Sequence, residues 1–145
     1  MRKKTIEEYI ETISSLEDRE GRAQTGRVAS RMNVKPSSAT EILQKLQGEG
    51  LLKYETYSGA TLTPAGKKLA RDLNRKHGVI AEFLEIIGVE KSVADADACQ
   101  IEHHVSRESF EQLEKFVEFA KGSLHDPEWI DSFRKFCDIL KTDPR

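Results

Sequence analysis

The residues best suited to chemistry gather in one short stretch of the second half of the chain, Cys99-Gln100-Ile101-Glu102-His103. On an α-helix, positions i, i+3 and i+4 lie on one face, so the Cys99 sulfur, the Glu102 carboxylate and the His103 imidazole would stand together. Thiolate, carboxylate and imidazole are all ligands of first-row transition metals. A cysteine alone is more often a packed core thiol. The shared face of the three side chains therefore predicts a transition-metal site.

Further candidate ligands lie outside this cluster. Glu8 and Glu11 are three residues apart on a predicted first helix, and His77 lies on a long helix in the middle of the chain. Each has a simpler explanation: Glu8 as a capping residue, Glu11 as part of a solvated face, and His77 as an exposed histidine between domains. A site that drew ligands from all three helices would connect the first half of the chain to the second.

The apolar pattern of the first half predicts three helices. They cover residues 5–16, residues 25–31, and the segment from Pro36 to about residues 48–50. Thr5 is expected to cap the first helix in a capping box with Glu8. Two short helices joined by a tight turn are the helix-turn-helix pattern, in which the second helix enters the major groove of DNA.

A predicted β-hairpin follows directly. Two β-rich runs, residues 51–57 and 60–63, flank the turn Ser58-Gly59. A hairpin placed directly after a helix-turn-helix is the wing of a winged helix. Thr63 and Pro64 then begin a long helix that should end near Ile87.

The remaining sequence is expected to be helical. The predicted helices run over residues 93–105, over residues 107–121 with Ser106 as cap, and onward from Asp126-Pro127. The expected fold is therefore mainly α. An N-terminal winged helix-turn-helix DNA-binding domain would cover residues 1–72, and a C-terminal all-helical metal-binding and dimerisation domain would cover residues 73–145.

Composition and charge fit this division. Residues 1–76 carry 15 Lys and Arg against 10 Asp and Glu, whereas residues 77–145 carry 8 against 15. A basic first half suits contact with a polyanion such as DNA. No apolar run approaches a membrane span, and the start of the chain does not look like a secretory signal. Two cysteines are too few for a disulfide framework, so a cytoplasmic protein is expected.

The second helix of the helix-turn-helix carries the candidate DNA contacts. The hydroxyls of Ser37, Ser38 and Thr40 can contact phosphates or base edges. Basic residues nearby would neutralise phosphates and make binding depend on salt. The full predicted set is Arg27, Lys35, Pro36, Ser37, Ser38, Thr40, Gln44 and Lys45. The alternative is a winged helix that contacts protein, but hydroxyls and lysines favour DNA over an apolar partner.

Several stretches together resemble one known family. They are Glu8-Tyr9-Ile10-Glu11, Pro36-Ser37-Ser38-Ala39-Thr40, Gln44-Lys45-Leu46, residues 62–68, residues 83–89, and Ile101-Glu102-His103-His104. The chain resembles the diphtheria-toxin-repressor family of iron- and manganese-dependent repressors, most closely its short two-domain manganese-transport-regulator branch. The resemblance implies a homodimeric repressor of metal-homeostasis genes, not an enzyme, that binds double-stranded operator DNA when loaded with a divalent metal.

The resemblance also implies a ligand set: Glu8, Glu11, His77, Cys99, Glu102 and His103. Manganese-type members have a carboxylate where this chain has Cys99, and iron-type members have a methionine where it has Glu8. Because thiolate disfavours Mn²⁺, we expect Fe²⁺ first and Mn²⁺ next, with Zn²⁺ or Co²⁺ as further candidates. Asp95, one helical turn before Cys99, could serve as an outer ligand.

Two rival classes remain open at this point. An enzyme could use Cys99 as a nucleophile with a nearby histidine as base, although the sequence contains no recognisable oxyanion or phosphate loop. A metal-independent winged-helix regulator could respond to a small molecule or to oxidation of Cys99. A metal titration of DNA binding separates these classes, because only a metalloregulator gains affinity with divalent ions.

Overall fold

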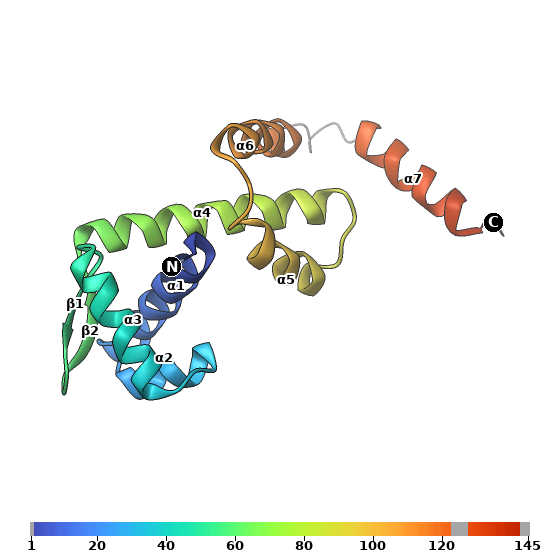
Figure 1. Ribbon diagram of the computed structural model, residues 1–145. Coiled ribbons are helices and arrows are strands. Elements are labelled where there is room, and N and C mark those ends of the chain that lie inside the picture. The colour runs from blue at the N-terminus through green and yellow to red at the C-terminus, as the bar shows by residue number, and fades with distance from the viewer. Residues whose placement is uncertain (1, 123–127, 143–145) are drawn as a thin grey trace. The chain divides into compact units, whose positions relative to one another are not determined.

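The computed structural model describes residues 2–122 and 128–142. The chain divides into two compact units, Met1–Lys76 and His77–Arg145, and the division falls inside a helix (Figure 1). None of the helices in these described ranges is both long enough and apolar enough to cross a bilayer.

Helix α1 (Lys3–Glu20) begins earlier than its sequence predicts. The backbone carbonyl of Arg2 accepts the first helical hydrogen bond, from the Ile6 amide at 3.1 Å. The expectation that Thr5 caps this helix was therefore wrong, because Thr5 already lies within the first turn. At its other end α1 runs four residues past the predicted range and stops at Gly21, which has a φ of 83° and donates its N–H to the Glu17 carbonyl at 2.8 Å.

The helix-turn-helix is formed by α2 (Thr25–Met32) and α3 (Pro36–Gly48), as the sequence predicts. Asn33 makes the turn with a φ of 56°, and the Val34 amide closes it on the Ala29 carbonyl at 3.0 Å. Asparagine tolerates this left-handed conformation better than most residues. The core of the first unit is built from buried apolar residues of α1 to α3 and the hairpin, including Ile10, Ile13, Val28, Leu43, Leu46 and Leu52.

The wing consists of β1 (Leu52–Glu55) and β2 (Gly59–Leu62), which pair antiparallel with Leu52 opposite Leu62. The first strand begins one residue later and ends two residues earlier than predicted, since the chain turns over residues 56–58 and leaves Tyr57 96% exposed. The backbones of Ala23 and Ala60 exchange two hydrogen bonds of 2.9 Å. These bonds anchor the wing to the segment before α2.

Helix α4 (Pro64–Ile86) begins as predicted, with the Thr63 hydroxyl accepting the Gly66 amide at 3.2 Å. The second unit continues with α5 (Lys91–Ile101), α6 (Arg107–Gly122) and α7 (Glu128–Thr142). Ser106 caps α6 through the Ser109 amide, again as expected. The predicted start of α7 at Asp126-Pro127 lies outside the described residues.

Helix α5 ends at Ile101 rather than at Val105. The amides of His104 and Val105 both bond to the Ile101 carbonyl, at 2.9 and 3.1 Å, so the chain tightens into a turn there. Beneath this turn lies a small core of Ile80, Ala81 and Ala98. The last two predicted ligands of the cluster therefore stand at the end of a helix and not in its middle.

Candidate functional site

The second unit assembles a group of donor atoms around His77, which lies half-buried on α4. Its Nδ1 lies 3.1 Å from Glu102 Oε2 and 3.7 Å from Cys99 Sγ. Its Nε2 lies 3.6 Å from Asp95 Oδ1. Thus α4 supplies the imidazole, and α5 with its terminal turn supplies a thiol and two carboxylates.

Glu102 and His103 are the most buried members of this group, with 1% and 7% of their surface exposed. His103 Nε2 lies 3.5 Å from Glu102 Oε1. Glu102 keeps helical backbone angles, φ −56° and ψ −28°, although it stands one residue past α5. It therefore stays in phase with Cys99, as the spacing of the two residues requires.

This donor set fits a divalent transition metal. A buried carboxylate is costly unless cations or hydrogen-bond donors surround it. Here both sides of Glu102 face imidazole nitrogens, at 3.1 and 3.5 Å. Ligands bound to one ion at about 2.0–2.3 Å stand roughly 3–4 Å from one another, which is the spacing seen here. The exposed thiol of Cys99 lies at the open side of the group.

Glu8 and Glu11, the other two predicted ligands, belong to the first unit. Both are half-buried, one turn apart on α1, and Glu8 Oε1 lies 4.0 Å from Lys4 Nζ. Their neighbour Glu7 is only 3% exposed, which the sequence-based prediction did not anticipate. A signal was present, since Glu7 precedes the core residue Ile10 by three positions.

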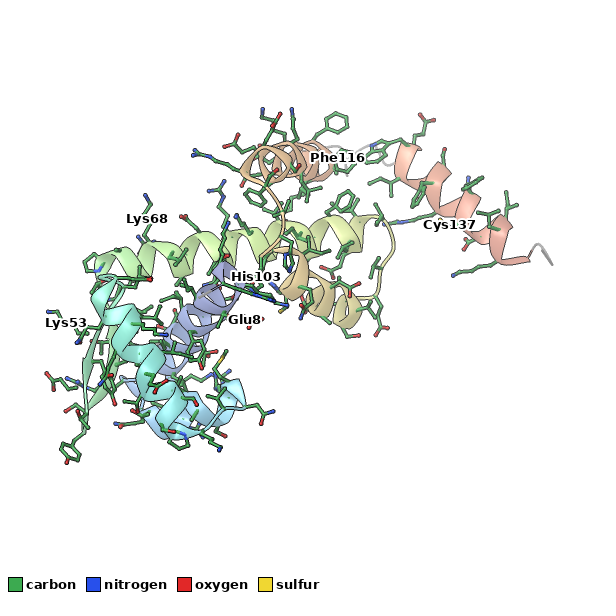
Figure 2. All side chains as sticks on the ribbon, in the orientation of Figure 1. Glu8, Lys53, Lys68, His103, Phe116 and Cys137 are labelled. Carbon is green, nitrogen blue, oxygen red and sulfur yellow. The ribbon has the colours of Figure 1, made fainter. Side chains whose placement is uncertain are left out.

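The predicted DNA contacts lie on the first turns of α3 and around them. Lys35, Pro36, Ser37, Gln44 and Lys45 are exposed, and Ser38 and Thr40 are half-buried. The Thr40 hydroxyl donates to the Pro36 carbonyl at 3.0 Å, so its oxygen can act towards DNA only as an acceptor. Figure 2 labels Lys53, a further basic residue, exposed on β1 of the wing.

Arg27 has a partner that the sequence did not indicate. Its Nε and Nη2 lie 3.1 and 2.8 Å from Glu20 Oε1, and its side chain is 56% exposed. An exposed ion pair of this kind is weak, so a phosphate can compete for the guanidinium. Arg27 therefore contributes less net charge to the DNA-facing surface than Lys35 or Lys45.

Two family models match consecutive parts of the chain. Residues 1–60 match the family model described as the iron dependent repressor N-terminal DNA binding domain. Residues 63–131 match the iron dependent repressor metal binding and dimerisation domain. The chain is 39% identical to the HTH-type transcriptional regulator MntR of Bacillus pumilus over 82% of this chain and 83% of the relative.

Solved structures of metal-dependent regulators also resemble this chain. The manganese regulator SloR superposes with a TM-score of 0.65 at 30% identity, over 79% of this chain and 54% of SloR. ScaR with bound Zn²⁺ gives 0.67 at 32% identity, over 79% and 54%. This chain thus spans about half the length of either structural relative. From the two domain models, the MntR relatives and these folds, the chain belongs to the iron-dependent repressor family of metal-dependent transcriptional regulators.

Proposed function

We propose that this protein is a DNA-binding transcriptional repressor of metal-homeostasis genes, active as a homodimer loaded with a divalent transition metal. The observation that carries the proposal is that Glu102 Oε2 and Cys99 Sγ, from α5 and its terminal turn, lie 3.1 and 3.7 Å from the same ring nitrogen of His77 on α4. The relatives are named as transcriptional regulators, which supports a regulatory rather than an enzymatic role.

We assign DNA binding to the first part of the chain, and metal binding and dimerisation to the second. Residues 1–72 would bind the operator through α3 and its flanking basic residues, with Lys35 and Lys45 on phosphates. Residues 73–145 would hold the ion and the second subunit. The ligands proposed in this second part are His77, Cys99, Glu102 and His103, and the family resemblance adds Glu8 and Glu11 from α1.

The bound ion would supply positive charge and a fixed coordination geometry. Side chains from α4 and α5 would then lose their independent motion, and Glu8 and Glu11 would hold α1 with them. The dimer would then populate fewer conformations, mainly those in which its two recognition helices can enter major grooves about 34 Å apart. Operator affinity would rise because less conformational freedom is lost on binding.

For the metal, we propose Fe²⁺ first and Mn²⁺ next. The Cys99 thiol favours the softer ion, whereas carboxylates at Glu102 and Glu8 suit the harder one. Relatives named as manganese regulators support Mn²⁺, and a ScaR structure holds Zn²⁺. The donor chemistry and the relatives thus point to different ions, which a direct ranking resolves.

The test is operator binding measured anaerobically, with a chelator and then with Fe²⁺, Mn²⁺, Zn²⁺ or Co²⁺ at buffered free concentrations. We expect tight binding to the promoter of a neighbouring metal-transport gene with metal, and about 100-fold weaker binding with chelator. A scrambled duplex gives the nonspecific baseline. Equal affinity with chelator and with every metal would rule out the metal switch and favour a metal-independent regulator.

The partner surface we propose lies on α6 and α7. Phe133, Phe136, Ile139 and Leu140 are 42%, 57%, 65% and 47% exposed along one side of α7. Trp129 joins this apolar stripe to α6, its ring centroid lying 6.0 Å from Phe116 and 6.2 Å from Phe119. Figure 2 labels Phe116 on α6 and Cys137 on α7. An exposed apolar stripe is a candidate association surface, and we take a second copy of this chain as its occupant because the metal binding and dimerisation model matches residues 63–131, which include α6 and Trp129.

We expect Phe136→Glu to weaken the dimer at least about tenfold, since a carboxylate would be buried in an apolar interface. Sedimentation velocity across a concentration series measures the change. Arg134→Glu introduces the same residue on the opposite, exposed side of α7 and should leave the dimer intact. Equal dissociation constants for the two variants would place the interface elsewhere.

A further inference from the structure

We propose that Asp95 is a positioning residue that orients His77 for metal binding, and not itself a ligand. The inference rests on the proposed function, because it concerns how the metal site is prepared. It assigns different tasks to the two carboxylates of α5 and its terminal turn that approach His77.

The geometry separates the two nitrogens of the His77 ring. Nδ1 faces Glu102 Oε2 at 3.1 Å and Cys99 Sγ at 3.7 Å. Nε2 faces Asp95 Oδ1 at 3.6 Å, within ion-pair range. The imidazole ring therefore stands between the Asp95 carboxylate and the other donors. One ion held by Nδ1, Cys99 and Glu102 would lie on the far side of the ring from Asp95.

A histidine ligand must offer an unprotonated nitrogen, so its proton has to sit on the other nitrogen. A carboxylate beside that second nitrogen accepts the N–H, selects the tautomer and makes the ring a better donor. Asp95 suits this task. Its side chain is 50% exposed to solvent, whereas that of Glu102 is fully buried between two imidazole rings.

The backbone explains why these groups stay in register. Asp95 lies four residues before Cys99 on α5, so both side chains leave the same face of the helix one turn apart. His77 lies on the facing surface of α4, and Ala98 packs with Ile80 and Ala81 between the two helices. This small, alanine-lined contact lets the helices approach closely enough for one imidazole to contact both turns of α5.

The decisive comparison is Asp95→Asn against Asp97→Asn. Asp97 is exposed on the same helix, two positions on and about 200° around the axis. The 145-residue chain is titrated anaerobically with Co²⁺ in competition with a chelator, and the near-ultraviolet thiolate-to-Co²⁺ band reports Cys99. We expect Asp95→Asn to weaken Co²⁺ binding about 10- to 100-fold with the band and the stoichiometry retained, and Asp97→Asn to match the parent protein within about twofold.

A second readout separates positioning from general support of the fold. In the Zn²⁺-loaded protein, ¹⁵N chemical shifts of His77 should show Nε2 protonated in the parent and a loss of this preference in Asp95→Asn. The thermal unfolding midpoints of the two chelator-treated proteins should stay equal. If Asp95→Asn bound one Co²⁺ ion fewer per subunit than the parent protein, Asp95 would be a ligand. If the Co²⁺ affinity of Asp95→Asn were unchanged, Asp95 would play no part in the metal site. Absence of the thiolate band in the parent protein would overturn the proposed ligand set itself.

Discussion

Replacing His103 with alanine is expected to abolish the metal-dependent gain in operator affinity, a loss of about 100-fold or more in the metal-loaded assay. The imidazole is 7% exposed and contacts Glu102, so its loss removes one donor and leaves one side of a buried carboxylate without its imidazole neighbour. Cys99→Ala and Glu102→Gln should have the same effect. Weak, salt-sensitive binding to nonspecific DNA should remain in all three, since the helix-turn-helix is untouched.

The matched control is the adjacent histidine. His104 is exposed in the turn after α5, whereas His103 beside it is buried, and His104→Ala should keep its metal response. Fluorescence anisotropy on a labelled operator, at fixed free Fe²⁺ or Mn²⁺, compares the two variants directly. A metal response that survives in Cys99→Ala, Glu102→Gln and His103→Ala alike would show that the ion binds elsewhere.

Gly66→Ala is expected to lower the free energy of unfolding by about 2–4 kcal/mol. A Cβ at this position would overlap the carbonyl oxygen of Leu51. That oxygen cannot easily move, because it accepts the Thr63 amide at 3.1 Å and so holds the end of the wing against the start of α4. The variant should therefore disturb the wing and the register of α4 together.

Gly78→Ala, on the same helix, is the control. A Cβ there meets nothing within 4 Å, so this change should be neutral or stabilise by about 0.5–1 kcal/mol through its helix propensity. Urea unfolding of the chelator-treated proteins gives both values. Equal stability of Gly66→Ala and the parent protein would contradict the close approach of Leu51 to α4.

We expect the metal preference to depend on one residue that local sequence identifies, Cys99. Cys99 places a thiol among donors that otherwise suit a harder ion. Cys99→Glu and Cys99→Asp replace the thiol with a carboxylate. In the assay of metal-dependent operator binding, both variants should therefore prefer Mn²⁺ over Fe²⁺ more than the parent protein does. A change of preferred ion in these variants would show that the exposed side chain at position 99, and not the buried Glu102 and His103, sets the metal preference.

Local sequence alone determined the order and type of the elements. Pro36 at the start of α3, the Thr63 cap of α4 and Gly21 after α1 all act within a few residues of themselves, so their effects are visible in the chain. The same holds for Cys99 and Glu102, whose common direction follows from helical spacing. The capping box at Thr5 failed because the backbone of Arg2 was enough to begin α1 two residues earlier.

Only the tertiary structure decided which atoms meet. His77 is 22 residues from Cys99 and 25 from Glu102, and its ring could have turned either nitrogen toward them. Asp95, which the sequence offers as an outer ligand, lies 3.6 Å from the second nitrogen of that ring, Nε2, and the spacing along α5 could not show this. Likewise Glu20 holds Arg27, and Leu51 excludes any side chain at Gly66. Such contacts depend on how separate elements pack, which short-range periodicity does not encode.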